Sequence, residues 1–567
     1  MNKVLKYICA ASIAVMSASC MDLDPKDQIS DSNLWGKAED FQLFTNQMYG
    51  WTYSFAETVY DGTHSDKRSD LIADKGGINQ YAKGINTVPS SDGNYTNGYK
   101  RIRNCNLLLE RAAGYGGDQA EIAQAVGEAY FFRAYSYFEM LRLYGDLIIV
   151  RSTLDTDSEE LYASRNDRTE VMDLIISDLH AATEHLKTFK SVEKGRISEE
   201  GAWAYLSRVA LYEGTWQKFH NNNTEKANAY LTEAAEAARK VMDSGTFRLF
   251  YNNILGETSQ KYMFILEDLA KSNPAGLTKS DNTEYIFFRR YDDSDTRHSK
   301  NLTVECLNNA QVISRKMAQM YLCSDGLPIE KSEKFQGYDK MTSEWQQRDN
   351  RMRYNMSRPG DLFYNGTSSS AHINWDDSDN GSTLTPTSGS RYFAQKWACE
   401  RQVESTKESY DFPIIRYAEV LLNYAEALYE LNGSISDEDL DLSLNLTRCR
   451  VNPEMPKLSN AFVSANGLDM RTEIRRERTV EFFNEGFRRD DLCRWKTAEK
   501  EMPGRFLGVK WTGTEYVLRG GTLGYPLDED GCIIYEDGRV FEQKHYLYPL
   551  PTEQLQLNPN LKQNPQW

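Results

Sequence analysis

Long stretches with helical spacing of apolar side chains constrain the fold of this chain of 567 residues more than any other feature. Residues 120–144 (AEIAQAVGEAYFFRAYSYFEMLRLY) repeat apolar side chains at helical intervals, are rich in good helix formers and stop at Gly145. Further helices are predicted at 168–186, with Thr169 as the expected N-cap, and at 198–212. A mostly α fold is therefore expected.

Small alanines recur in other segments, where two helices would have to touch. Residues 201–216 (GAWAYLSRVALYEGTW) and 226–245 (KANAYLTEAAEAARKVMDSG) resemble the two helices of a tetratricopeptide pair, and 414–433 (IIRYAEVLLNYAEALYELNG) has the same character. Each such pair buries one face only against its neighbours. We expect an α-helical superhelix of tetratricopeptide-like helix pairs separated by long insertions. An irregular helical bundle is the alternative.

Three stretches lack this character and are rich in Gly, Ser, Asn, Asp and aromatic residues. They cover residues 50–99, 270–300 and 355–412. Irregular loops of this length within a compact domain are usually functional, so we expect them to carry the ligand-binding side chains. Residues 503–548 instead alternate Gly with β-forming residues, which predicts small β-hairpins.

The first twenty residues, MNKVLKYICAASIAVMSASC, have the layout of an export signal. Lys3 and Lys6 form a basic start, an apolar stretch too short to span a bilayer follows, and small residues lead into Cys20. We expect residues 1–19 to be a lipoprotein signal peptide, Cys20 to be the lipid attachment site, and residues 20–567 to form one domain. Ordinary signal cleavage without acylation of Cys20 is the alternative.

The charge balance and the cysteines exclude several classes of partner and site. Lys and Arg number 66 against 83 Asp and Glu, a formal net charge of −17. Proteins bind nucleic acids and anionic lipid surfaces largely through basic side chains, so no nucleic-acid partner is expected. The nine cysteines include no CxxC pair. The sequence therefore predicts neither a zinc site nor a disulfide framework, and leaves a single bridge open.

Motifs of catalysis are missing from the sequence. It has no GxSxG elbow, no GxxxxGK[ST] loop and no HExxH pair, and its seven His are scattered. Residues 376–387 match the first half of a calcium-binding loop but end on Thr387, where the bidentate Glu is required. We expect no enzyme, no metal and no cofactor, with calcium the one ion left open. Because paired carboxylates around a sugar are not recognisable from sequence, a glycoside hydrolase remains the remote alternative.

The densest charge cluster lies at residues 473–496 (EIRRERTVEFFNEGFRRDDLCRWK). Its spacing predicts a helix on which acidic side chains pair with arginines three and four residues away. The acidic residues of these expected pairs are Glu473, Glu477, Glu481 and Glu485.

Within this cluster, ERTVEFFNEGFRRDDLCRW strongly resembles the C-terminal hallmark of the SusD/RagB family. Three other stretches agree in order: residues 127–150 resemble the first repeat helix of the family and its exit turn, residues 411–432 a later repeat, and residues 548–567 its terminal tail. The resemblance extends over the whole mature chain. These motifs are specific for the fold rather than for a ligand.

The resemblance implies a SusD-like lipoprotein of the outer membrane, on the cell surface, that takes part in polysaccharide utilisation. Such a protein binds oligosaccharide or polysaccharide without cleaving it and delivers it to a SusC-like TonB-dependent transporter for glycan uptake. Asp22 and Asp24 resemble the acidic tag that sends some lipoproteins to the extracellular face. A peptide-binding surface lipoprotein of the same uptake type is the alternative, because tetratricopeptide concavities often hold peptides.

A neutral glycan is bound by aromatic rings stacked on its apolar C–H faces and by polar side chains on its hydroxyls. Exposed aromatic and polar residues on loops are therefore the candidates. Tyr95 stands just before the YKRIRNCN helix, at a place where family members often carry a stacking aromatic; the others lie in polar or Gly- and Ser-rich loops. The predicted ligand-binding residues are Asp66, Tyr95, Tyr291, Trp375, Arg391 and Tyr392.

Overall fold

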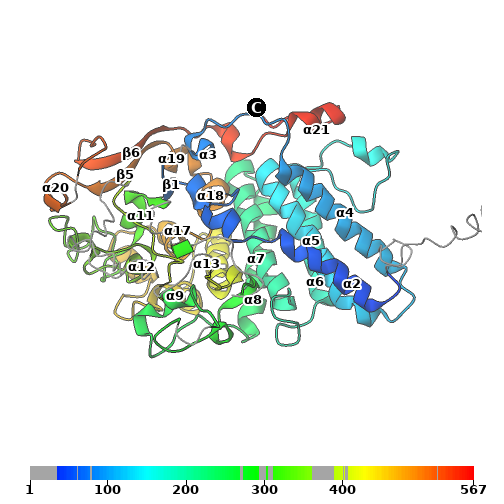
Figure 1. Cartoon of the computed structure of the whole chain (residues 1–567), viewed down its shortest axis with the longest axis horizontal. Helices are drawn as coiled ribbons and strands as arrows, with labels where there is room; N and C mark the ends of the chain where they lie inside the picture. The colour runs from blue at the N-terminus through cyan, green and yellow to red at the C-terminus, as the bar shows by residue number, and fades with distance from the viewer. Residues whose placement is uncertain are drawn as a thin grey trace, which may run out of the picture.

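The computed structural model describes residues 35–60, 62–76, 79–268, 272–292, 302–303, 311–359, 389–399, 401, 407–519 and 522–567. Figure 1 shows the long helices gathered on one side of the molecule, and short helices, hairpins and loops on the other. The mostly α fold is confirmed. The signal peptide, Cys20, Trp375 and the calcium-like segment 376–387 lie outside the described residues.

The elements have the following bounds. The longer helices are α2 (Ala38–Asn46), α4 (Gly93–Ala113), α5 (Gln119–Tyr144), α6 (Arg168–His185), α7 (Glu199–Trp216), α8 (Thr224–Asp243), α13 (Tyr417–Asn432) and α17 (Met470–Glu481). The short ones are η3 (Asp66–Arg68), α3 (Gln80–Lys83), η4 (Glu159–Tyr162), α9 (Ser259–Met263), α11 (Arg315–Met320), α12 (Arg351–Asn355), α14 (Asp437–Leu442), α15 (Leu444–Cys449), α16 (Asn460–Ala465), α18 (Arg488–Arg494), α19 (Ala498–Glu501), α20 (Tyr516–Arg519) and α21 (Thr552–Leu557). Antiparallel strands pair β1 (Ile72–Asp74) with β3 (Gln311–Ile313), β2 (Tyr285–Arg289) with β4 (Phe412–Arg416), and β5 (Gly504–Lys510) with β6 (Cys532–Arg539).

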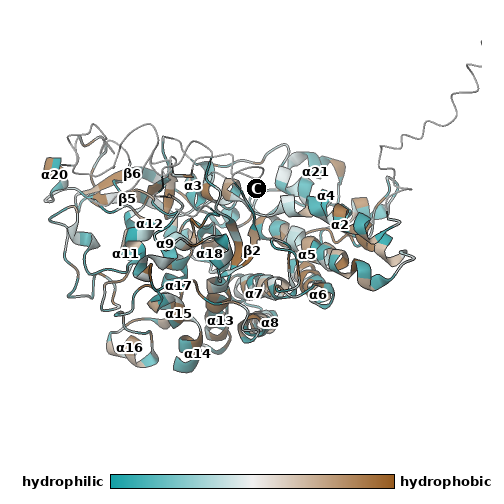
Figure 2. Ribbon diagram, turned by 60° about the horizontal axis from the view of Figure 1, so that its bottom comes forward, coloured by the Kyte–Doolittle hydropathy of each residue, from teal (hydrophilic) through white to brown (hydrophobic). Residues whose placement is uncertain are grey.

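The long helices pack in chain order, α4 on α5, α5 on α6, α6 on α7 and α7 on α8, and α13 continues the row against α7 and α8 after a long insertion. Figure 2 shows α6, α7, α8 and α13 side by side along one edge. Buried alanines such as Ala210, Ala234 and Ala238 have side chains small enough to let neighbouring helices approach closely. The predicted superhelix of tetratricopeptide-like pairs is confirmed.

Two predicted boundaries were wrong. Helix α6 is capped by Asp167, whose carboxylate accepts a hydrogen bond from the backbone N–H of Thr169 at 2.8 Å, so Thr169 lies inside the helix. The segment 414–433 begins as strand β4 and becomes helical only at Tyr417. Strand β4 is held by its pairing with β2, which comes far earlier in the sequence, and local spacing carries no signal of that contact.

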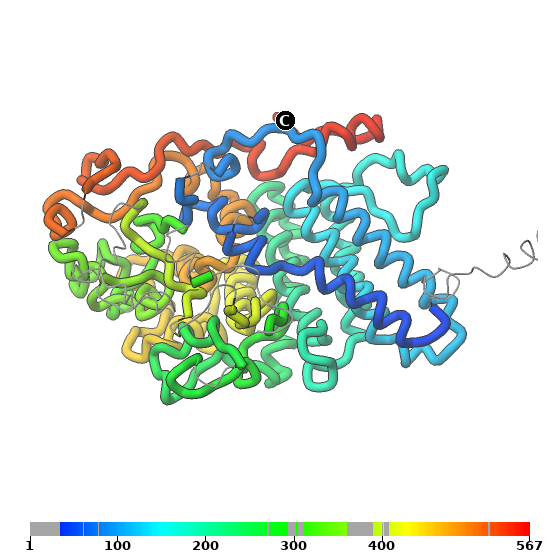
Figure 3. The backbone as a smooth tube through the Cα atoms, in the orientation of Figure 1, coloured from blue at the N-terminus to red at the C-terminus, as the bar shows by residue number. Residues whose placement is uncertain are grey.

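The predicted hairpin region forms the β5–β6 pair, which packs on a second hydrophobic core separate from that of the long helices. Tyr392, Phe393, Val509 and Ile533 are completely buried there. Figure 3 shows the C-terminal segment running along the upper edge of the molecule beside the residues before α4. Hydrogen bonds from Thr552 N to Pro89 O and from Glu553 N to Ser90 O fasten the two segments together.

Buried arginine–carboxylate pairs connect neighbouring helices of the row. Short pairs of this kind, with several hydrogen bonds each, fix the relative positions of the helices because either partner alone would be an uncompensated buried charge. The pairs are Arg133–Asp178 between α5 and α6 at 2.6 Å, Arg168–Glu213 between α6 and α7 at 2.7 Å, Arg208–Glu419 between α7 and α13 at 2.6 Å, and Arg494–Glu426 between α18 and α13 at 2.5 Å. Burial raises the pKa of Glu426, but Arg494 outweighs that and lowers it to about 2.

The charge cluster at 473–496 forms longer-range contacts than its spacing predicted. Glu473 does pair locally with Arg476, at 3.3 Å. Glu481, however, accepts hydrogen bonds from arginines of α12, β4 and the turn after α15, and Glu485 binds Arg416 and Lys396. The prediction of local pairs was therefore wrong for Glu481 and Glu485, which bind basic side chains from distant parts of the chain.

His64 lies between two carboxylates beneath the surface. Its Nε2 is 3.1 Å from Glu139 and its Nδ1 is 3.7 Å from Asp490, and Arg142 binds both acids. Burial lowers the pKa of His64, but Glu139 and Asp490 outweigh that and raise it to about 9. Protonated His64 therefore stabilises the fold. This contribution is complete below the unfolded-state pKa of about 6.5 and is lost as pH rises through about 9.

Raising the pH from 6 to 9.5 is thus expected to remove up to about 3 kcal/mol of unfolding free energy through His64. In His64→Gln this part of the pH dependence should disappear, because glutamine does not titrate. Urea unfolding at the two pH values measures it, with exposed His185→Gln as the matched control, which should keep the wild-type loss. An equal loss in wild type and His64→Gln would contradict the assignment.

Candidate functional site

A cavity of about 450 Å³ opens between α4, the segment after α5, η4 and the tail around α21. Asp92 is the N-cap of α4: its carboxylate accepts from Asn94 N, and it also accepts from the hydroxyl of Tyr144 at 2.6 Å. Figure 1 shows these elements together at the upper right, with α21 beside the start of α4 and the loop that carries η4. The residues of α4 that line the cavity include Tyr95, Tyr99, Ile102 and Arg103.

Hydroxyl and amide groups of the long helices hold the wall formed by the segment after α5. Tyr99 accepts from the backbone N–H of Ile148 at 2.9 Å, and Tyr137 accepts from that of Val150 at 2.7 Å. The amide of Asn106 donates to the carbonyls of Val150 and Ser152 at 3.1 and 3.0 Å. This wall is therefore preformed although it has no regular secondary structure.

Asparagines of the C-terminal tail hold the opposite rim. Asn558 donates to the carbonyls of Leu161 and Ala163 at 3.2 and 2.9 Å, and Asn560 donates to the carbonyl of Tyr162 at 2.7 Å. These bonds use only the backbone of η4. The side chain of Tyr162 remains 53% exposed.

The lining suits a ligand that has both apolar and hydrogen-bonding faces. Tyr162 offers an exposed ring, and Leu161 and Leu557 are exposed apolar neighbours on the rim. Arg103 and Gln554 supply donors. Pyranose rings combine apolar C–H faces with hydroxyl edges and match such a lining.

A second cavity of about 610 Å³ lies on the other side of the same segment. It shares Val150, Ser152, Leu154 and Glu160 with the first and is closed by polar residues of α6. The segment between α5 and η4 therefore lines two cavities.

Of the six residues predicted from the sequence, Tyr95 is the one that the described structure brings to this cavity. Its ring packs at 5.2 Å against those of both Tyr99 and Tyr144 and is 3% exposed, so it forms the floor rather than a free stacking platform. Asp66 lies elsewhere, where its buried carboxylate accepts from Arg488 N at 3.2 Å. Burial raises the pKa of Asp66 to about 7.

The other described candidates are buried in the two cores. Tyr291 packs on Phe55, with ring centroids 5.8 Å apart. The hydroxyl of Tyr392 donates to Glu344 at 2.8 Å, and Arg391 donates to Thr522 O at 3.0 Å. All three are at most 8% exposed and act as packing elements in this structure. Their contacts with a ligand, like that of Trp375, stay predictions.

Sequence reasoning missed Tyr162, Arg103 and the tail asparagines. Tyr162 occurs in EELYA, which is neither long nor rich in Gly or Ser and gave no sign of a binding loop. The one available signal was the tail NPNLKQNP, because closely spaced asparagines next to prolines suggest side chains that bind backbone. That signal does not indicate which backbone segment the asparagines bind, so η4 could not have been identified from it.

Two family models match this chain in succession. The first, described as "Starch-binding associating with outer membrane", matches residues 23–211, and the second, described as "SusD family", matches residues 283–567. The chain belongs to the SusD family. Helices α4 to α6 and most of α7 fall within the first matched range, and α13, the charge cluster at 473–496 and the C-terminal tail fall within the second.

Curated SusD-like relatives agree with this assignment. SusD-like proteins P38 and P2 of Formosa agariphila are 24% and 30% identical over 253 and 159 residues, which are 41% and 27% of this chain. The matches cover 45% and 31% of those two proteins, so the chain spans less than half of their length. A SusD-like protein of Bacteroides ovatus is 24% identical over 453 residues, 76% of this chain and 70% of that protein.

Solved structures of SusD-like proteins have the same fold. One from Bacteroides fragilis superposes with a TM-score of 0.72 at 22% identity, covering 96% of this chain and 100% of that one. A SusD-like carbohydrate binding protein from the same species gives 0.71 at 20%, covering 93% and 99%. Surface glycan-binding protein A from Bacteroides fluxus gives 0.60 at 16%, covering 94% and 100%. At these identities the likeness concerns the fold.

Within the described residues, no helix is long and apolar enough to cross a bilayer, and no group of three or more His, Cys, Asp and Glu is placed to hold a metal ion. Cys105, Cys323, Cys399, Cys449, Cys493 and Cys532 are free thiols.

Proposed function

We propose that this protein binds oligosaccharide at the cell surface, does not cleave it, and delivers it to a SusC-like TonB-dependent transporter of the outer membrane. Membership of the SusD family supports this, as do the SusD-like fold neighbours described as carbohydrate binding and surface glycan-binding. The proposal includes lipid attachment at Cys20, an extracellular orientation and no cofactor.

The cavity beside η4 is the observation that carries the binding part of the proposal. Its volume of about 450 Å³ is within the range of small-molecule sites, and its walls are held by hydrogen bonds that a ligand need not form. A preformed wall reduces the ordering cost of binding. We assign the sugar-stacking role to Tyr162 and the hydroxyl-binding roles to Arg103 and Gln554.

Isothermal titration and affinity electrophoresis of the protein from Met21 onward, with neutral plant, fungal and host glycans, test the proposal. Saturable binding is expected with at least one glycan, and no new reducing ends are expected after prolonged incubation. Accumulation of reducing ends would instead indicate a glycoside hydrolase.

A pool of short peptides is the matched alternative ligand. If peptides bind and no glycan does, the proposed glycan cargo would be wrong and a peptide cargo would take its place.

The transporter step is tested separately. The SusC-like protein is expected to co-purify with the lipidated chain, and loss of co-purification in Cys20→Ala would show that the lipid anchor contributes to the complex.

A further inference from the structure

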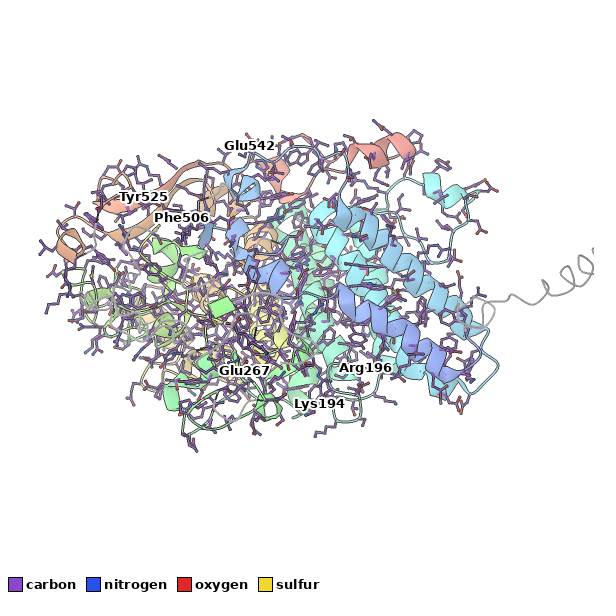
Figure 4. All side chains as sticks on the ribbon, viewed as in Figure 1. Lys194, Arg196, Glu267, Phe506, Tyr525 and Glu542 are labelled. Carbon is purple, nitrogen blue, oxygen red and sulfur yellow. The ribbon has the colours of Figure 1, made fainter. Side chains whose placement is uncertain are left out.

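A third cavity, of about 440 Å³, is lined by α11, the end of α19 and the β5–β6 pair. Its lining contains six basic side chains and four acidic ones. Arg505 and Arg539 are paired with Glu529 and Glu536 outside the lining, and the basic residues left without an ion-pair partner in the described part of the chain are Arg315, Lys500 and Lys510. Figure 4 places Phe506 and Tyr525 at the end of the molecule that carries this strand pair, away from the helices around the cavity beside η4.

Arg315, the first residue of α11, is 9% exposed and its guanidinium lies 4.4 Å above the ring of Tyr338. Its Nη1 is buried without a hydrogen-bond partner, and in the described part of the chain no carboxylate lies within ion-pair distance of Arg315. A buried guanidinium N–H that lacks an acceptor is costly, and arginine is seldom buried unless it is paired.

Arg539, the last residue of β6, also lines the cavity and shares one feature with Arg315, a buried N–H donor without an acceptor. It is 4% exposed; its Nε donates to Glu536 at 2.8 Å and its Nη1 to the carbonyl of Ser69 at 2.8 Å. Its Nη2 is buried and has no partner. Two arginines that line one cavity therefore each keep a donor unused.

Two of the four acidic lining residues, Asp70 and Glu501, are already bound by other basic side chains, and the other two are Asp528 and Asp530. Asp70 is bound by Arg488 and Lys316, and Glu501 is bound by Lys316. Asp528 accepts from the backbone N–H of Cys532 at 2.7 Å. Arg539 is paired with Glu536 outside the lining, whereas Arg315 has no carboxylate partner in the described part of the chain, so the charge of Arg315 is the uncompensated one.

Lysines and one aromatic ring complete the cavity. Lys500 is exposed and Lys510 half-buried, and within the described ranges neither has an ion-pair partner. Phe506 contributes an apolar surface, with the guanidinium of Arg539 4.5 Å from its ring. Guanidinium groups bind carboxylate and sulfate oxygens through parallel N–H donors, and lysines add charge at the rim.

We propose that this cavity binds the oxyanion group of an acidic saccharide, a uronate carboxylate or a sulfate ester, through Arg315 and Arg539. The proposal rests on the proposed function, since a bound glycan is the source of the oxyanion. It adds a substrate class, acidic glycans, and a second contact region on the chain.

Calorimetric titrations with sodium glucuronate, with glucose and with sodium sulfate, at fixed ionic strength, test the proposal on the full mature chain. Glucuronate should bind, glucose should not reproduce that signal, and sulfate should displace glucuronate. Arg315→Gln should weaken glucuronate binding about tenfold or more, the scale of one hydrogen bond to a charged group.

The double variant Lys500→Gln/Lys510→Gln is a second test that does not disturb a buried side chain. It should weaken glucuronate binding severalfold, whereas Lys187→Gln, an exposed lysine after α6, should leave it unchanged. A thermal melt of each variant shows whether it is folded, so the double variant still tests the site if Arg315→Gln does not fold.

Three results would overturn the proposal: no glucuronate binding, equal binding of glucuronate and glucose, or wild-type affinity in both Arg315→Gln and the double lysine variant. Sulfate binding without glucuronate binding would overturn the saccharide assignment in favour of a free inorganic anion. If neutral glycans bind but glucuronate does not, the proposed function would stand and only this inference would be wrong.

Discussion

Glu481→Gln is expected to lower the free energy of unfolding by about 3–5 kcal/mol, the usual cost of removing one partner from a buried ion pair. Glu481 is completely buried and accepts from Arg351 at 3.0 Å, Arg416 at 2.7 Å and Arg450 at 2.5 Å. Burial raises the pKa of its carboxyl, but these arginines outweigh that and hold the pKa far below its usual range. An amide removes the one carboxylate that all three arginines share, and leaves three guanidinium groups with fewer acids to balance them.

Urea unfolding of wild type and variant measures the loss. The matched control is Glu529→Gln, which removes the carboxylate from an exposed pair with Arg505, where a change within about 1 kcal/mol is expected. Similar losses in the two variants would refute a central role for Glu481.

A double-mutant cycle with Arg450→Met separates the pair from its surroundings. If Glu481 and Arg450 stabilise mainly each other, the double variant should lose clearly less than the sum of the single losses. Additive losses would instead place the importance of Glu481 in its contacts with Arg351 and Arg416.

The contacts of Glu481 show which ion pairs a local sequence pattern can predict and which it cannot. The spacing of glutamates and arginines in 473–496 predicted pairs within one helix, and Glu473 with Arg476 is such a pair. The arginines that hold Glu481 lie 31, 65 and 130 residues away in sequence, and spacing carries no information about contacts of that range. Recognising the motif identified the fold without explaining why the motif stabilises it.

The helices were predictable for the opposite reason. Residues 120–144 form a helix because their own side chains favour it, and it stops where Gly145 takes a φ of 74°. Ile414 and Ile415 are also apolar but form part of a strand, because β2 offers them a partner. Local sequence preference determines the secondary structure where tertiary contacts favour the same structure. Where they favour another structure, the tertiary contacts determine it.

Burial explains why some predicted site residues lie in the cores while Tyr162, which was not predicted, is exposed at the cavity beside η4. Tyr392 and Arg391 stand in a Gly- and Ser-rich sequence that suggested an exposed loop, yet Tyr392 belongs to the second core and Arg391 is buried beside its Trp511. Tyr162 stands in an unremarkable acidic segment and is exposed because Asn558 and Asn560 hold its backbone from the far end of the chain. Exposure of an aromatic ring is set by distant contacts, which composition does not encode.

Tyr162→Ala is expected to weaken binding of the glycan found in the titrations by about 1–3 kcal/mol, roughly five- to 150-fold in Kd, the scale of one anchoring aromatic side chain. The ring is half exposed on the rim, while the tail binds only its backbone carbonyl. Its removal should therefore take away stacking area without loosening η4. Calorimetry measures Kd, and an unchanged urea midpoint would show that the fold is intact.

Tyr251→Ala is the control because Tyr251 is 52% exposed and does not line the cavity beside η4. The two tyrosines are exposed to nearly the same extent, so general effects of removing a surface tyrosine should be similar in both variants. Equal affinities in Tyr162→Ala, Tyr251→Ala and wild type would move the glycan site away from this cavity. A loss confined to Tyr162→Ala would make the C-terminal tail part of the binding apparatus, since its asparagines hold that ring in place.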